Sequence, residues 1–198
     1  MTTLLIGCGA LAREVIALRD KHQWDAEVLA LPVLLHNTPQ RIPDAVIDKI
    51  SSLRPNYERV IVVYGDCGTG GLLDSRLDEI GVERVAGPHC YEMYAGDDFQ
   101  NIMDEEPGTY FLTDYLVQSF DHLVIEGLGL DRYPELHEMY FGNYRRVIYL
   151  QQREDDTLLA KAYLAADALK LPLEIRPVGY GALESRLLKL LENVIPTA

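Results

Sequence analysis

The 198-residue sequence has no apolar run approaching the roughly 18 residues that a membrane-spanning helix needs. Basic residues are also scarce, with 18 lysines and arginines against 31 aspartates and glutamates, for a net charge of −13. Nucleic acids and anionic membranes attract proteins through positive charge, so neither is an expected partner. The opening residues "MTTLLIGC" lack a basic leader, and we interpret them as the first strand of a cytoplasmic protein.

Cysteine is scarce as well, with three residues in the whole sequence. An odd number cannot pair completely within one chain, and nothing indicates export, so a disulfide framework is not expected. The sequence contains no C-x-x-C, no G-x-x-x-x-G-K-[ST] and no G-x-G-x-x-G, which are the common metal and nucleotide signatures. The thiols are therefore expected to be free or metal-bound.

Apolar β-forming runs alternate with stretches of helical period, which is typical of parallel strands joined by crossover helices. We therefore expect a Rossmann-like α/β fold with a mostly parallel sheet, in one domain over residues 1–198. Residues 88–145 lack clean periodicity, so a helical or irregular insertion, or a second lobe, is expected within them. The clearest helices are Leu158–Leu169 and Leu183–Val194. The expected strands are Thr3–Gly7, Glu27–Leu31, Arg59–Tyr64, Arg84–Ala86, Thr109–Leu112, Arg146–Leu150 and Leu173–Arg176.

Four loops follow expected strands and carry residues suited to chemistry. They are "IGCGALARE" at 6–14, "LLHNTPQRIP" at 34–43, "YGDCGTGG" at 64–71 and "GPHCYE" at 87–92. Loops at the carboxyl ends of parallel strands converge on one crevice, where ligands usually bind. We expect that crevice to bind a small-molecule substrate.

The three cysteines in these loops predict a metal site. Each is flanked by glycine or histidine and is expected to open a helix, whose N-terminus lowers the pKa of a thiol. A zinc ion can be held by three cysteines and a histidine, or by two cysteines and a histidine with one coordination position open for catalysis. An iron–sulfur cluster held by three cysteines leaves one iron without a protein ligand. The expected ligands are Cys8, Cys67 and Cys90, with His89 or His36 completing the shell. Alternatively, each cysteine packs as a small buried hydrophobic residue.

The glycine-rich loop has a competing interpretation as an anion cradle. Its backbone amides, at Gly65, Gly68 and Gly70, together with the Thr69 hydroxyl, are donors suited to a phosphate. The same glycines also suit tight turns alone.

Two acidic residues beside the cysteines have several possible roles. Asp66 and Glu92 are candidates for a catalytic base or for orienting a metal-bound imidazole, with helix capping as the alternative.

Seven ordered motifs together carry a family resemblance: "CGALAREV", "LLHNTPQRIP", "YGDCGTGGLLD", "GPHCYEMYAG", "GTYFLTDYL", "GLGLDRYPEL" and "YFGNYRRVIYLQQ". They resemble the uncharacterised family called domain of unknown function 1638, from Cys8 to about Gly181. The resemblance implies a soluble bacterial or archaeal protein without an agreed activity. Because members are often encoded near corrinoid-dependent methyltransferase components, it also implies a link to one-carbon metabolism.

The leading expectation is a cytoplasmic enzyme, dependent on zinc or an iron–sulfur cluster, that acts on a small one-carbon or methylated metabolite. A corrinoid would enter through a partner protein. One alternative is a non-catalytic accessory module that docks on a corrinoid protein or its methyltransferase through residues 88–145. Another is a metal-free enzyme that binds an anionic metabolite and uses Cys67 as a nucleophile.

Overall fold

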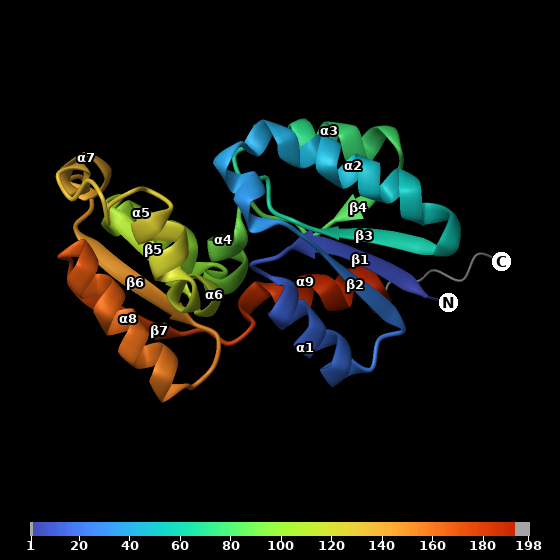
Figure 1. Ribbon diagram of the computed structural model, residues 1–198. Helices are drawn as coiled ribbons and strands as arrows, with labels where there is room; N and C mark the ends of the chain where they lie inside the picture. The colour runs from blue at the N-terminus through green and yellow to red at the C-terminus, as the bar shows by residue number, and fades with distance from the viewer. Residues whose placement is uncertain (1, 193–198) are drawn as a thin grey trace. The chain divides into compact units, whose positions relative to one another are not determined.

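A computed structural model describes residues 2–192 of the chain (Figure 1). They form two compact units. The first combines Met1–Met93 with the segment from Ala182 onward, and the second spans Tyr94–Gly181. Within residues 2–192, no helix is both long and apolar enough to cross a membrane.

The first unit contains a four-stranded parallel sheet in the order β2-β1-β3-β4. All six residues of β1 and the last four of β3 are buried. Strands in the middle of a parallel sheet are covered on both faces, which explains why these two read as continuous apolar runs. The bounds are Thr3–Cys8 for β1, Ala26–Leu31 for β2, Arg59–Val63 for β3 and Glu83–Arg84 for β4.

Four main helices cover this sheet, with α2 and α3 on one side and α1 and α9 on the other (Figure 1). Helices α1 and α9 contact each other through Lys21 and His22 of α1, which lie 2.7 and 2.6 Å from the Glu184 carboxylate of α9. Leu183 and Leu187 form the buried stripe of α9. The helix bounds are Ala12–His22 for α1, Ile42–Leu53 for α2, Leu72–Glu79 for α3 and Gly181–Glu192 for α9, and short 3₁₀ turns cover Val33–Asn37, Pro39–Arg41 and Arg54–Asn56.

The second unit contains a three-stranded parallel sheet in the order β5-β6-β7. Leu112 of β5 and Tyr149 of β6 belong to its core, together with Leu158 and Leu169 of α8. Its strands are β5 (Thr109–Thr113), β6 (Arg146–Gln151) and β7 (Leu173–Pro177). Its helices are α5 (Asp98–Glu105), α6 (Asp114–Gln118), a π-helical segment (Asp121–Glu126), α7 (Leu136–Phe141) and α8 (Asp156–Leu169), and the unit boundary falls inside α4 (Cys90–Ala95).

The expected parallel α/β fold is confirmed, and each expected strand is present with its ends shifted by a few residues. The structure differs in dividing the strands between two sheets, and its second unit begins and ends later than the expected insertion at 88–145. Alternating strands and helices look the same in sequence whether they build one sheet or two. The expected helix Leu183–Val194 is present as far as Glu192, and its last two residues lie outside the described range.

A buried polar network joins the carboxyl ends of β5 and β6 in the second unit. The Tyr149 hydroxyl donates to the Asp114 carboxylate at 2.7 Å, and the Gln152 amide donates to the same oxygen at 3.0 Å. Asp114 is only 3% exposed, so its charge depends on these donors for stabilisation. The network fastens the start of α6 to the end of β6.

Removing the Tyr149 hydroxyl is expected to destabilise the second unit. A hydrogen bond to a buried charge contributes about 2 kcal/mol, so Tyr149→Phe is expected to lower the free energy of unfolding by about that amount. Hydrogen exchange of the β6 amides measures the change. Unaltered protection in β6 would show that Asp114 does not rely on this hydroxyl.

Candidate functional site

The sheet order of the first unit places the candidate residues at one edge. The chain leaves β1 towards β2 and then crosses back to β3, so a topological switch point lies between β1 and β3, where open α/β sheets usually bind ligands. Cys8 is the last residue of β1, His36 lies in the turn after β2, and Cys67 follows β3. His89 and Cys90 follow β4. The expected convergence of the four loops at one sheet edge is therefore present.

Two of these loops are fastened to each other through their backbones. The amides of Asp66 and Cys67 donate to the carbonyls of Gly87 and Pro88, at 3.2 and 2.7 Å. A Cβ atom on Gly65 would lie 2.5 Å from the Cα of His89, so only glycine permits this approach. These contacts set the spacing between the loop of Cys67 and the loop of Cys90.

The three thiols share one electrostatic environment. Burial, with a smaller contribution from the nearby Cys8 thiol, raises the pKa of Cys67 to about 11. Burial also raises the pKa of Cys90, with further contributions from Cys67 and Cys8. Cys8 is 3% exposed, and burial raises its pKa although the Ala10 amide donates to its sulfur at 3.3 Å. All three groups are therefore protonated thiols near neutral pH.

The expectation that helix N-termini lower these pKa values is wrong. Cys8 ends a strand four residues before α1, and Cys67 lies five residues before α3. Only Cys90 begins a helix, and α4 spans just six residues. Burial therefore outweighs the helix dipole at all three thiols.

Within residues 2–192, no three histidine, cysteine or acidic side chains stand where they can hold one metal ion together. The two histidines differ in the nitrogen they present. His36 Nδ1 lies 2.9 Å from the Val33 carbonyl, which only accepts, so Nδ1 carries the hydrogen and Nε2 is the basic nitrogen. His89 Nδ1 instead accepts from the Glu92 amide at 3.4 Å, and burial lowers its pKa. His36 is therefore the histidine whose Nε2 is in the metal-binding form.

The donors of the glycine-rich loop face inward, towards Asp66. The Thr69 hydroxyl and the Gly71 amide donate to one carboxylate oxygen at 2.5 and 2.8 Å, and the Gly70 amide donates to the other at 3.1 Å. Although burial opposes it, these bonds and one from Gly68 lower the pKa of Asp66. These donors thus bind the carboxylate of their own loop, which favours the tight-turn interpretation over the competing anion cradle, and Gly65 packs closely against His89.

The other acidic candidate, Glu92, is also engaged within the fold. Both of its carboxylate oxygens accept from the Arg186 guanidinium of α9, at 2.6 and 2.5 Å, and Arg186 donates to the Ala86 carbonyl as well. Arg186 thus ties α9 to α4 through Glu92 and to the segment before His89 through Ala86. In this arrangement Asp66 and Glu92 fasten the loops that carry the thiols.

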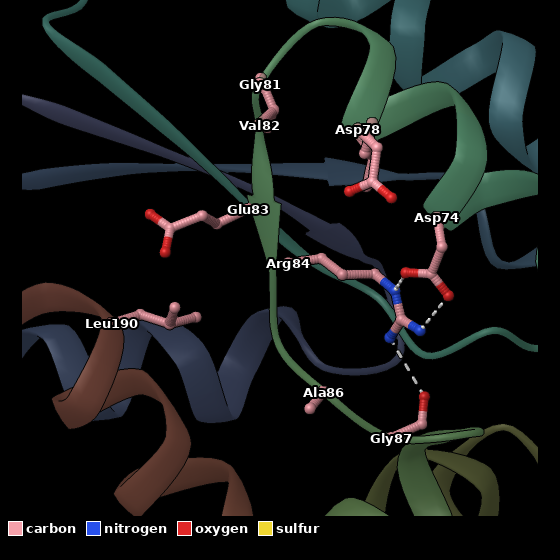
Figure 2. A pocket seen from close by; sticks show the side chains of 10 residues that line it. Asp74, Asp78, Gly81, Val82, Glu83, Arg84, Ala86, Gly87 and Leu190 are labelled. Carbon is pink, nitrogen blue, oxygen red and sulfur yellow. Dashed lines mark hydrogen bonds and ion pairs between the residues drawn. The ribbon is translucent and has the colours of Figure 1, made fainter.

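Arg84 of β4 is a site residue that the sequence reasoning missed (Figure 2). Two of its nitrogens bind the Asp74 carboxylate at 2.5 and 2.7 Å, and the third donates to the carbonyls of Tyr64, Val85 and Gly87. Arg84 therefore joins the end of β3 to the segment that leads to His89. Its charge also acts to lower the pKa of Cys67, against the larger effect of burial.

A cavity of about 530 Å³ lies beside Arg84 of β4 (Figure 2). Asp78 and Leu190 are among its lining residues, from α3 and α9. None of the three cysteines lines it. The cavity is therefore not the expected substrate crevice.

Tyr64, directly after β3, is a second missed residue. The sequence pattern predicts that it belongs to the strand, because it ends the run "RVIVVY", yet its position at a strand end is the signal that marks it. Its side chain is fully buried, and its ring stacks on His36 with centroids 5.9 Å apart. Its hydroxyl lies close enough to Cys8 for each group to affect the pKa of the other.

The first loop also contains Gly7-x-Gly9-x-x-Ala12, the alanine form of the dinucleotide-binding motif, which the sequence reasoning overlooked. Its backbone amides are already used within the fold. The Gly9 amide donates to the Leu31 carbonyl, the Ala10 amide to Cys8 Sγ, and the Leu11 amide to the Cys8 carbonyl. The loop therefore offers no open cradle for a pyrophosphate.

Comparison with known proteins yields one family. The family model described as "Protein of unknown function (DUF1638)" matches residues 30–187, well over half of the chain. The chain belongs to this family. The DUF1638 match includes His36, Cys67 and Cys90 but begins after Cys8, so it is shorter at its start than the resemblance we described. No curated protein and no solved structure matches the chain.

Proposed function

We propose that the first unit binds zinc or an iron–sulfur cluster through Cys8, Cys67 and Cys90, as part of an enzyme acting on a small one-carbon or methylated metabolite. The observation that supports it is that three thiols from three strand ends lie within one another's electrostatic field. The thiols are neutral when no cation is bound, and a cation that displaces their protons would offset the charge of the three thiolates that form.

Metal binding by these residues would require a movement of the loops. Because the side chains do not stand at ligating spacing within residues 2–192, the loops after β3 and β4 must close on Cys8. We assign His36 as the fourth ligand, since its Nδ1 is held by Val33 and its Nε2 is basic. When bound, zinc would supply Lewis-acid chemistry or activation of a bound thiol or water.

The substrate class and the partner are supported by the sheet topology and by the family resemblance. Switch points of open α/β sheets usually bind small ligands, and the one-carbon chemistry with its corrinoid-bearing partner follows from the family resemblance. An accessory docking role is favoured by three exposed side chains of the second unit, Tyr133, Met139 and Tyr140, at 52%, 65% and 39% exposure. Capture of a purified corrinoid protein by a chain without its cysteines would favour docking over catalysis.

A metal-free enzyme with Cys67 as nucleophile is favoured by one observation. Cys67 has a φ of 49°, a left-handed conformation that is strained for a cysteine and common at functional sites. Its raised pKa acts against it, because the thiolate is the nucleophile. Selective alkylation of Cys67 near neutral pH, blocked by phosphate compounds, would favour this alternative.

Elemental analysis of anaerobically purified protein, with an absorption spectrum, tests the metal proposal. We expect about one zinc ion or one cluster per chain. Cys67→Ser and His36→Gln are expected to weaken metal binding about tenfold or more. His122→Gln is the matched control, because His122 is an exposed histidine of the second unit. Absence of bound metal, together with no measurable zinc affinity in the wild-type chain, would overturn the proposal.

Zinc binding is also expected to release protons. Because burial raises the pKa of the thiols, they are protonated near neutral pH and must lose their protons to coordinate. Titration with zinc at about pH 7 in weak buffer should therefore release about three protons per ion. The Cys67→Ser variant should release fewer. Zinc uptake without acidification would mean that the thiols are not the ligands.

A further inference from the structure

Strand β4 lies at the edge of the first unit's sheet and leaves backbone groups unpaired. It is the last strand in the order β2-β1-β3-β4. The Val85 amide donates to the Val62 carbonyl of β3 at 2.9 Å. Because alternate residues of a paired strand turn their backbone groups to opposite sides, the N–H and C=O of Arg84 point away from β3. Within the described part of the chain, neither group has a hydrogen-bond partner, and nor does the Ala86 amide.

The cavity beside Arg84 lies next to these unpaired groups. Glu83, Arg84 and Ala86 all line it, and its volume is about 530 Å³. In Figure 2, Asp78 of α3 lies on one side of β4 and Leu190 of α9 lies on the other. An extended segment beside β4 would therefore have a helix next to each of its two faces.

The lining of the cavity has an excess of negative charge. Asp74, Asp78 and Glu83 line it with carboxylates, against the guanidinium of Arg84. Arg84 binds Asp74, and Glu83 lies 2.6 Å from Arg59, so each of these two acids has a cation beside it. Asp78 is exposed, and no cation in the described part of the chain pairs with it. A ligand with positive charge beside Asp78 would match this lining.

We propose that β4 binds an extended, basic segment of a partner protein, which adds to the sheet as a strand beside β4. The N–H and C=O of Arg84 pair with the backbone of that segment, as in other complexes formed by strand addition. Successive side chains of a strand point to opposite faces. One face of the segment thus meets Asp78 of α3, and the other meets Leu190 of α9. The segment therefore alternates lysine or arginine with apolar residues.

A second copy of this chain fits the same edge poorly. Its own β4 would bring the same carboxylates to the cavity, and the chain has a net charge of −13, so like charges would face each other. Metal binding is a separate matter, because none of the three cysteines lines the cavity.

A fluorescent, end-blocked peptide of alternating lysine and valine tests the proposal, with fluorescence anisotropy as the measure of affinity. Asp78→Lys is expected to weaken binding about 5-fold or more, because attraction becomes repulsion. Asp48→Lys is the matched control, since Asp48 is an exposed acid of α2 that does not line the cavity and gives the same change in net charge. Fluorescence of Trp24, the single tryptophan of the sequence, verifies that both variants fold.

The backbone part of the proposal has its own measurement. Hydrogen exchange followed by NMR should show the amide of Arg84 becoming protected when the peptide binds, and a peptide N-methylated at alternate residues should not protect it. No protection of Arg84 at millimolar peptide would overturn the proposal, as would equal effects of Asp78→Lys and Asp48→Lys. Protection that appears without peptide as the protein concentration rises would also overturn it, since a second copy would then occupy β4.

Discussion

Replacing Gly65 with alanine is expected to force apart the two loops that carry Cys67 and Cys90. The added Cβ would lie 2.5 Å from the Cα and 2.8 Å from the nitrogen of His89. These are backbone atoms and cannot turn aside as a side chain would, so the loops must separate. We expect a loss of about 3 kcal/mol or more, together with the hydrogen bond from the Cys67 amide to Pro88. Urea unfolding followed by Trp24 fluorescence measures the change.

Gly70→Ala is the matched control in the same loop. Gly70 has a φ of 66° and nothing within 4 Å of its missing Cβ, so alanine there meets left-handed strain but no clash. The expected cost is about 1 kcal/mol. In Gly65→Ala, Cys67 and Cys90 should also react faster with alkylating reagents, whereas Gly70→Ala should leave their rates near those of the wild type. Equal costs at the two positions would contradict the close approach at His89.

The second large effect is expected at Asp66. Its carboxylate accepts from the Thr69 hydroxyl and from the amides of Gly70 and Gly71. Asp66→Ala removes these bonds together and leaves several donors of the loop without their acceptor. The expected loss is about 2–3 kcal/mol. Trp24 fluorescence in urea measures it, and the reactivity of the neighbouring Cys67 should rise as the loop loosens.

The contribution of Asp66 is expected to depend on pH in a defined direction. Its pKa in the folded chain lies below the ordinary value of 3.8, so the folded state binds the proton less readily than the unfolded state. The stabilisation is therefore complete well above pH 3.8 and is lost as the pH falls through the folded pKa. Asp66→Asn should lack this dependence. The stability difference between wild type and Asp66→Asn should thus shrink in acid, and a constant difference would show that the charge is not what the loop recognises.

The sequence locates the acidic residues of the loops but does not reveal which groups they bind. The sequence marks Asp66, Glu92 and the glycines because such residues stand beside cysteines at strand ends. Glu92 binds Arg186, which lies 94 residues further along the chain, and no local pattern reveals such a partner. Asp66, by contrast, is bound by donors within five residues, so its loop-closing role follows from short-range geometry. Tyr64 and Arg84, which also affect the pKa values of the thiols, read in the sequence as ordinary strand residues.

The sequence by itself determined the parallel α/β class, the positions of the strands and the loops that carry the three thiols. These features depend on local apolar runs and helical period, which the order of residues records directly. Only the tertiary structure decided that the strands form two sheets and that burial raises the pKa of every thiol. Strand order and desolvation depend on contacts between distant segments, such as the one that brings Tyr64 beside Cys8, and a linear pattern does not specify those contacts.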